Sequence, residues 1–134
     1  MSNFKKLCEE LEEKILDSYA NGVSLEDAEK LAGQFLHAQI KVSEELKKAD
    51  LDARMRRSGV KSIRAAIYME AATKSDKKPS DVMLNAIVDM DSIVLNEQKS
   101  YDEAEVEAES LERYYDIFSN AHVHFRTIAK GRFE

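Results

Sequence analysis

Hydrophobic residues recur three and four positions apart from the start of the chain. Over residues 3–20 they form a single stripe, which predicts an amphipathic helix. The stripe consists of Phe4, Leu7, Leu11, Ile15 and Tyr19. Asn21-Gly22 is typical of a turn and should end this helix. Ser24 with Asp27 three residues later resembles a capping box, so we expect a second helix to start there.

This second helix is predicted to be long, because its apolar positions continue without Pro or Gly between Gly33 and Gly59. These positions are Leu25, Ala28, Leu31, Ala32, Phe35, Leu36, Ile40, Val42, Leu46, Ala49 and Ala53. We expect the helix to reach Arg56 or Arg57 and to break at Ser58-Gly59. A third, shorter helix should follow, defined by Ile63, Ala66, Ile67 and Ala71.

Residues 74–79 form the one clear loop, since their proline restricts the residue before it and has no N–H to continue a helix. Ser80 can cap a short helix after the loop, and Asp89 or Asp91 can cap a last helix that runs close to Lys130. The apolar residues of the short helix are Val82, Met83, Ala86 and Ile87.

The last helix carries a heptad seam, in which apolar positions alternate spacings of three and four. The seam consists of Tyr101, Ala104, Ala108, Leu111, Tyr115, Phe118, His122, Phe125 and Ala129. We interpret the residues from Tyr101 to Phe125 as an oligomerisation surface with coiled-coil-like packing. The alternative is an ordinary amphipathic helix that packs on its own domain. A second apolar line on this helix favours intermolecular packing, as does a length of roughly 57 Å for about 38 residues.

These elements predict an all-α protein with one domain over residues 1–134. The composition agrees, since 34% of residues are charged while the chain has only four glycines and one proline. Helices over 3–73, with a basic centre, are followed by an acidic helical segment over 80–130. We expect an elongated protomer in which the long C-terminal helix serves oligomerisation, and no strands.

The chain is expected to be a cytoplasmic protein without a membrane segment. Cys8 is the single cysteine and cannot form an intrachain disulfide, and no secretory signal precedes the first helix. Charges interrupt every hydrophobic stretch well before the roughly 20 residues that a membrane span requires.

Catalytic, metal and cofactor sites are not predicted. His122 and His124 are two residues apart, so on a helix they point about 200° away from each other and cannot share a metal ion. Cys8 is interpreted as a structural thiol rather than a nucleophile. The chain has no Gly-rich phosphate loop. Four alternating glutamates of the last helix are interpreted as a solvated acidic face: Glu103, Glu105, Glu107 and Glu109.

The net charge of −6 conceals a basic middle. Residues 41–78 carry a net charge of +5, whereas residues 79–118 carry −9. The candidate DNA-binding residues lie within this middle segment and are Lys47, Lys48, Arg54, Arg56, Arg57, Lys61 and Arg64. Such cations can contact a phosphate backbone, with Tyr68 the only nearby aromatic for base stacking. Alternatively, they pair with the acidic C-terminal helix, within or between protomers.

Several short features resemble the UvsY family, the recombination mediators of T-even-like phages. Residues 51–54, Leu-Asp-Ala-Arg, and the Ser-Gly pair at 58–59 are similar to the Leu-Lys-Ala-Arg segment and Ser-Gly turn of that family. Aspartates 89 and 91 precede the long final helix, as an Asp-rich segment does in that family. Residues 125–130 form a tail of aromatic, isoleucine and basic residues that is similar to the family's tail. The resemblance covers residues 40–134, and the total length is nearly the same.

The resemblance implies a cytoplasmic phage protein of the host cell that binds single-stranded DNA and assembles as a ring through its C-terminal helices. Such mediators help a RecA-like recombinase to displace the single-strand-binding protein and to form a filament in recombination and repair. The chain departs from the pattern at Asp52, where the family has Lys, while Arg54 matches.

Two other functions compete with this one. A non-enzymatic phage regulatory protein would use the acidic helix to mimic DNA or to grip a basic partner, and would not bind single-stranded DNA. A scaffolding protein would only oligomerise.

Overall fold

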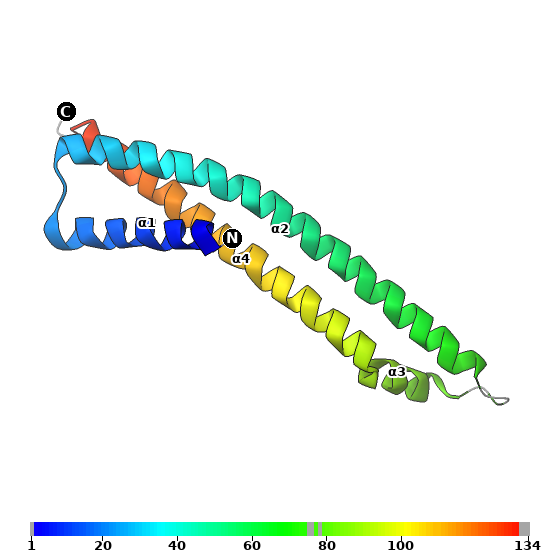
Figure 1. Ribbon diagram of the computed structural model, residues 1–134. Coiled ribbons are helices and arrows are strands. Elements are labelled where there is room, and N and C mark those ends of the chain that lie inside the picture. Colours follow the sequence, from blue (N-terminus) through cyan, green and yellow to red (C-terminus); the bar gives the residue numbers. More distant parts are fainter. Residues whose placement is uncertain (1, 75–76, 78, 132–134) are drawn as a thin grey trace. The chain divides into compact units, whose positions relative to one another are not determined.

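The computed structural model describes residues 2–74, 77 and 79–131, which form four helices. They are α1 (Ser2–Asn21), α2 (Leu25–Thr73), α3 (Asp81–Met90) and α4 (Ser92–Ala129) (Figure 1). The described residues contain no strand, so the predicted all-α fold with a long C-terminal helix is confirmed. The chain divides into two compact units, Met1–Leu46 with Ser110–Glu134 and Lys47–Glu109, called unit 1 and unit 2 below.

The expected break at Ser58-Gly59 is wrong, because α2 continues through it as one helix of 49 residues. Gly59 does not have the positive φ of a turn, unlike Gly22, whose φ is 74°. A glycine inside a helix costs about 1 kcal/mol relative to alanine. Burial of the adjacent Val60 side chain, which is 6% exposed, contributes about 1.5–3 kcal/mol and outweighs that cost.

The predicted helix starts are confirmed by their capping hydrogen bonds. The Ser24 hydroxyl accepts from the N–H of Asp27 at 3.1 Å, and the Ser80 hydroxyl accepts from that of Met83 at 3.3 Å. The Asp91 carboxylate accepts from the N–H groups of Ile93 and Val94 at 2.8 and 3.1 Å. Each side chain satisfies donors that have no partner in the first turn of a helix.

Unit 1 is a three-helix arrangement with an aromatic core. It combines α1, the first part of α2 and the last part of α4 (Figure 1). Phe35 of α2 lies between Phe118 and Phe125 of α4, with ring centroids 5.6 and 5.5 Å apart, and all three side chains are fully buried. Cys8 and Leu11 of α1 close the core.

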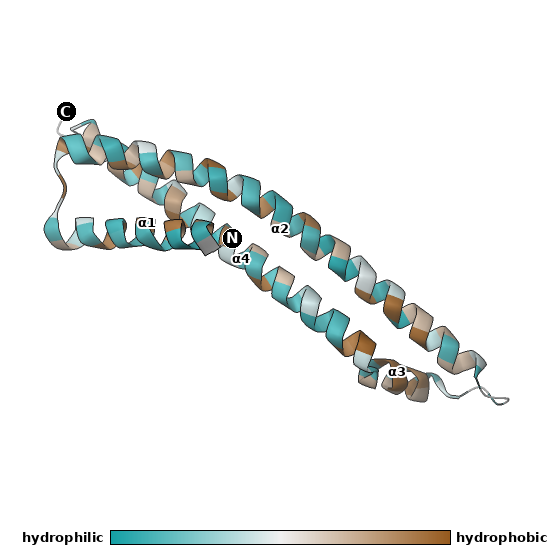
Figure 2. Cartoon of the chain, in the orientation of Figure 1, coloured by the Kyte–Doolittle hydropathy of each residue, from teal (hydrophilic) through white to brown (hydrophobic). Residues whose placement is uncertain are grey.

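Unit 2 combines the second part of α2, α3 and the first part of α4. Its buried residues are aliphatic, and they are Val60, Leu84, Val88, Val94, Ala104 and Ala108. α3 packs on α2, where the guanidinium of Arg64 lies 2.6 Å from the carboxylate of Asp89 and the Tyr68 hydroxyl donates to Asp81 at 2.8 Å. The hydropathy of α3 stands out, since apolar residues cover most of its surface (Figure 2).

Candidate nucleic-acid interface

Five of the seven predicted DNA-binding residues share one side of α2. Because α2 is continuous, its residues follow one another at about 100° around a single axis. The five cations then fall within an arc of about 100° on the flank of the buried face. This cationic flank consists of Lys47, Arg54, Arg57, Lys61 and Arg64. All five lie in unit 2.

The other two predicted cations are placed differently. Arg56 lies on the opposite flank, where its guanidinium is 3.0 Å from the carboxylate of Asp52. Asp52 therefore pairs with an arginine one turn further along the same helix. Lys48 also lies away from the cationic flank, about 100° around the helix from Lys47.

Within the chain, the ion pairs of Arg56 and Arg64 do not involve the acidic C-terminal helix, and pairing between copies stays a prediction. The pair of Arg56 stays within α2, and that of Arg64 goes to Asp89 of α3. Lys47, Arg54 and Lys61 are exposed, and no hydrogen bond or ion pair joins them to another of the described residues. These three side chains are therefore available to an external anion.

Arg57 and Tyr68 connect the flank to the neighbouring helices. Tyr101 of α4 donates to Glu105 at 2.6 Å, which raises the pKa of its hydroxyl, while the positive charge of Arg57 acts in the opposite direction. The hydrogen bond to Asp81 raises the pKa of Tyr68 and holds its ring at the end of the flank. Asp50 is the one acid on the flank, so the local net charge there is positive.

The predicted oligomerisation residues are mostly buried within a single chain. Ala104 and Ala108 are buried in unit 2, and Leu111, Phe118 and Phe125 are buried in unit 1. The remaining members of the surface, Tyr101, Tyr115 and His122, are half-buried. This burial is what the alternative of a helix packed on its own domain requires, so the pattern needs no second copy to explain it. Association of copies stays a prediction.

The two histidines of α4 contact residues of other helices in unit 1, and neither belongs to a metal site among the described residues. His122 Nδ1 lies 2.9 Å from the carbonyl oxygen of Ala32, and the ring of His124 stacks on Tyr19. No group of three or more His, Cys, Asp or Glu among the described residues could hold a metal ion. Glu103 and Glu107 lie on the opposite side of α4 from Glu105 and Glu109. The four glutamates therefore do not form one acidic stripe.

Cys8 is buried in unit 1, beside Glu9 and Glu12 of the same helix. Burial and the two carboxylates raise the pKa of the thiol to about 11, which disfavours the thiolate that a nucleophile needs. Burial and a hydrogen bond to Glu12 also raise the pKa of Tyr114.

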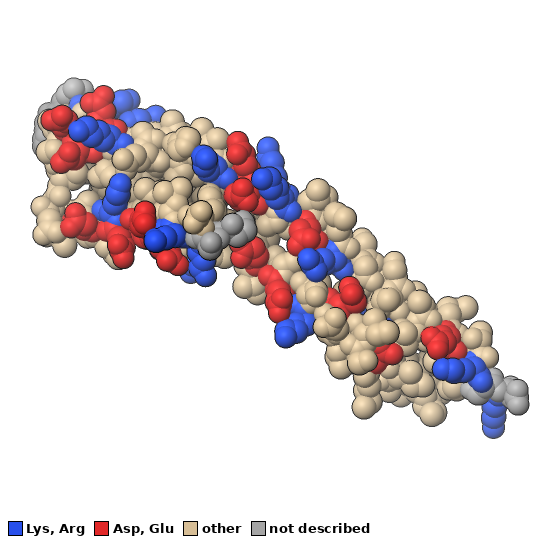
Figure 3. Space-filling model, viewed as in Figure 1, with Lys and Arg blue, Asp and Glu red and all other residues tan. Residues whose placement is uncertain are grey.

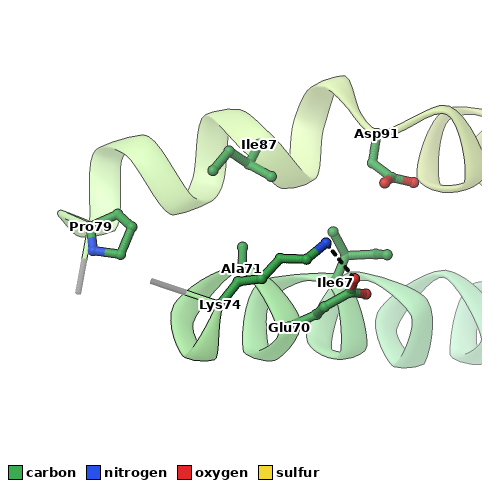
Figure 4. A pocket seen from close by; sticks show the side chains of 7 residues that line it. All are labelled: Ile67, Glu70, Ala71, Lys74, Pro79, Ile87 and Asp91. Carbon is green, nitrogen blue, oxygen red and sulfur yellow. Dashed lines mark hydrogen bonds and ion pairs between the residues drawn. The ribbon is translucent and has the colours of Figure 1, made fainter. Parts of the chain in front are cut away.

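A hollow of about 350 Å³ lies between the end of α2 and α3 in unit 2. Ile67 and Ala71 of α2 face Ile87 of α3 across it, and Lys74 pairs with Glu70 at 3.2 Å at its edge (Figure 4). The sequence pattern did not single out this region. Its signal was the broad apolar face of the short helix that carries Val82, Met83, Ala86 and Ile87.

No protein-family model, no curated protein and no solved structure matches the chain. None of the four helices in the described part is both long enough and apolar enough to cross a membrane. The resemblance to the recombination mediators therefore depends on the short sequence features alone. Of these, the Ser-Gly pair is helical here and does not form a turn.

Proposed function

We propose that this protein binds single-stranded DNA along the cationic flank of α2. The observation that carries the proposal is the flank itself, where Lys47, Arg54 and Lys61 are spaced seven residues apart and have no partner among the described residues. Seven residues are nearly two helical turns, so the three cations line up along the axis at intervals of about 10 Å. Such a row can follow a phosphate backbone.

The flank fits backbone recognition rather than sequence readout. Each cation that neutralises a phosphate releases a counterion, so a single strand bound through five cations should show a salt slope of about −3.5. Tyr68 is the one aromatic ring at this flank, and its hydroxyl is held by Asp81. Affinity should therefore be electrostatic and tolerant of base sequence.

The role of recombination mediator is the finer part of the proposal and rests on the sequence resemblance. A protein that holds single-stranded DNA beside a RecA-like recombinase would help the recombinase to displace the single-strand-binding protein. The readout is the lag before recombinase filaments form on a strand precoated with single-strand-binding protein. The protein should shorten that lag, and loss of the cationic flank should restore it.

DNA binding is tested by fluorescence anisotropy with labelled oligo-dT and a matched duplex over a range of salt concentrations. The test variant carries Lys47→Ala, Arg54→Ala and Lys61→Ala, which should reduce the magnitude of the salt slope by about 2. The control carries the same loss of charge at exposed lysines of unit 1, as Lys5→Ala, Lys6→Ala and Lys41→Ala.

Weakened binding by the flank variant together with near-normal binding by the control supports the proposal. Equal loss in both variants would show that only the net charge matters. Absence of oligo-dT binding by the unmodified protein would refute DNA binding and favour a protein-interaction function.

A further inference from the structure

α3 is apolar on the side that packs on unit 2 and also on the side that faces solvent. Leu84 and Val88 are buried, whereas Val82, Met83 and Met90 are 80%, 59% and 79% exposed. Ala86 lies between them and is exposed as well. Residues 81, 85 and 89 form the polar side of the helix, but the other exposed positions are apolar, and an apolar helix face is normally buried. The face formed by Val82, Met83, Ala86 and Met90, here the outer face of α3, therefore lacks a partner in the single chain.

The surroundings of the outer face extend the apolar surface. In the space-filling view, the region of α3 is mostly free of charged side chains (Figure 3). On one side, the outer face borders Ile87 and the hollow that Ile67 and Ala71 line (Figure 4). A single large apolar side chain of a partner could enter a hollow of this size.

The charges of α3 define the kind of partner. The helix and its two capping residues contain Asp81, Asp89 and Asp91 and no Lys or Arg. Asp89 keeps a side-chain exposure of 61% although it pairs with Arg64. Asp91 lies at the hollow together with Glu70, whose pair with Lys74 is exposed. Acidic groups thus flank the apolar face on both sides.

A second copy of α3 is a poor occupant for this face, because the pairing would bring the aspartates of both copies together, and of these only Asp89 has a cation, Arg64, paired with it in the described residues. A helix with an apolar stripe flanked by Lys or Arg matches both the surface and the charge. Methionine side chains, such as Met83 and Met90, adapt their shape to different apolar partners. Helices bind in this way through anchors at spacings of three and four.

We propose that the outer face of α3 binds a basic amphipathic helix of a partner protein. The partner's apolar stripe lies on Val82, Ala86 and Met90, and one of its anchors enters the hollow beside Ile87. Its cations meet Asp81 and Asp89 on one side and Asp91 on the other. The site adjoins the cationic flank, because Asp89 pairs with Arg64 of that flank, but it does not require that the protein bind DNA.

The probe is a labelled 16-residue synthetic peptide of Leu and Lys with leucines at helical spacing, about four turns long. Two control peptides have Glu in place of Lys, or the same Leu and Lys in an order without a stripe. The test variant, Val82→Thr with Met90→Gln, removes apolar surface without changing the charge or touching Leu84 and Val88. The matched control is Val106→Thr with Leu16→Gln, which are 63% and 67% exposed.

The striped Lys peptide should bind, and the α3 variant should weaken its binding by about tenfold, as expected for two side chains at the centre of an interface. The matched control variant should bind the striped Lys peptide as the unmodified protein does. Both control peptides should bind the unmodified protein much more weakly. Circular dichroism confirms that each variant keeps its helices.

Three results would overturn the proposal. The first is that the unmodified protein does not bind the striped peptide. The second is equal binding by the α3 variant, which would mean that the peptide adheres elsewhere by charge. The third is that the unmodified protein self-associates in light scattering but does not bind the peptide, and that the α3 variant does not self-associate. A second copy would then be the occupant of the outer face. Each result is independent of oligo-dT binding, so failure here leaves the DNA proposal standing.

Discussion

Phe118→Ala tests whether the seam of α4 is packed within one chain. Phe118 has no exposed surface, and its ring centroid lies 5.6 Å from those of both Phe35 and Tyr114. Replacing a buried phenylalanine by alanine costs about 3–5 kcal/mol. With a urea dependence of about 2 kcal/mol per M, the midpoint of unfolding should fall by about 2 M. Val123→Ala, at a residue of α4 that is 50% exposed, should cost less than about 0.5 kcal/mol.

The assay is urea unfolding followed by circular dichroism at several protein concentrations. A core within one chain unfolds with a midpoint that is independent of concentration. A seam between copies would instead gain stability by mass action, by about 2.7 kcal/mol for a roughly hundredfold increase in protein concentration. If the midpoint depends on concentration in this way, or if Phe118→Ala costs no more than Val123→Ala, the reasoning from burial is refuted.

Three further predictions concern the pKa of Cys8, a helix cap and a glycine. In the folded state, the pKa of Cys8 is raised from 9.0 to about 11, so the unfolded chain loses this proton at a lower pH than the folded protein. The free energy of unfolding should therefore decline by up to about 3 kcal/mol between pH 9 and 11, with no such loss below pH 9. Chemical unfolding of Cys8→Ala should show a smaller decline. Asp91→Ala removes two hydrogen bonds to the first turn of α4 and should cost about 1 kcal/mol in thermal unfolding, whereas Asp91→Asn should cost less. Gly59→Ala should stabilise α2 by about 0.4–1 kcal/mol. The new Cβ has room, because its nearest atom is the Glu97 carboxylate oxygen at 3.9 Å. Destabilisation would instead favour a turn at Ser58-Gly59.

The sequence predicted the helices well because their starts depend on local chemistry. Ser24, Ser80 and Asp91 each cap a helix with their own side chain, and a cap needs only the residues of one turn. Gly59 shows where local rules fail. A glycine lowers helix stability by about 1 kcal/mol wherever it occurs, but only tertiary packing, here around Val60, decides whether the helix breaks.

The candidate site could be predicted only in part. The cations were visible in the sequence, yet the expected break placed them on two helices and hid their common side. With α2 continuous, Lys61 and Arg64 join the side of the helix that carries Lys47 and Arg54. The heptad seam was also visible, but spacing alone cannot show whether the partner of a seam belongs to the same chain or to another.

The two units differ in the residues that form their cores and in the surfaces proposed for binding. Unit 1 contains the buried phenylalanines, among them Phe35 and Phe118, and large buried rings contribute most to stability. The buried residues described for unit 2 are aliphatic, such as Leu84 and Ala104, and its outer face of α3 leaves apolar surface in water. An isolated domain gains nothing from such exposure, since each buried CH₂ would contribute about 0.8 kcal/mol. Both the cationic flank and the outer face of α3 belong to unit 2, so the apolar face of α3 lies in the unit where binding would compensate for its exposure.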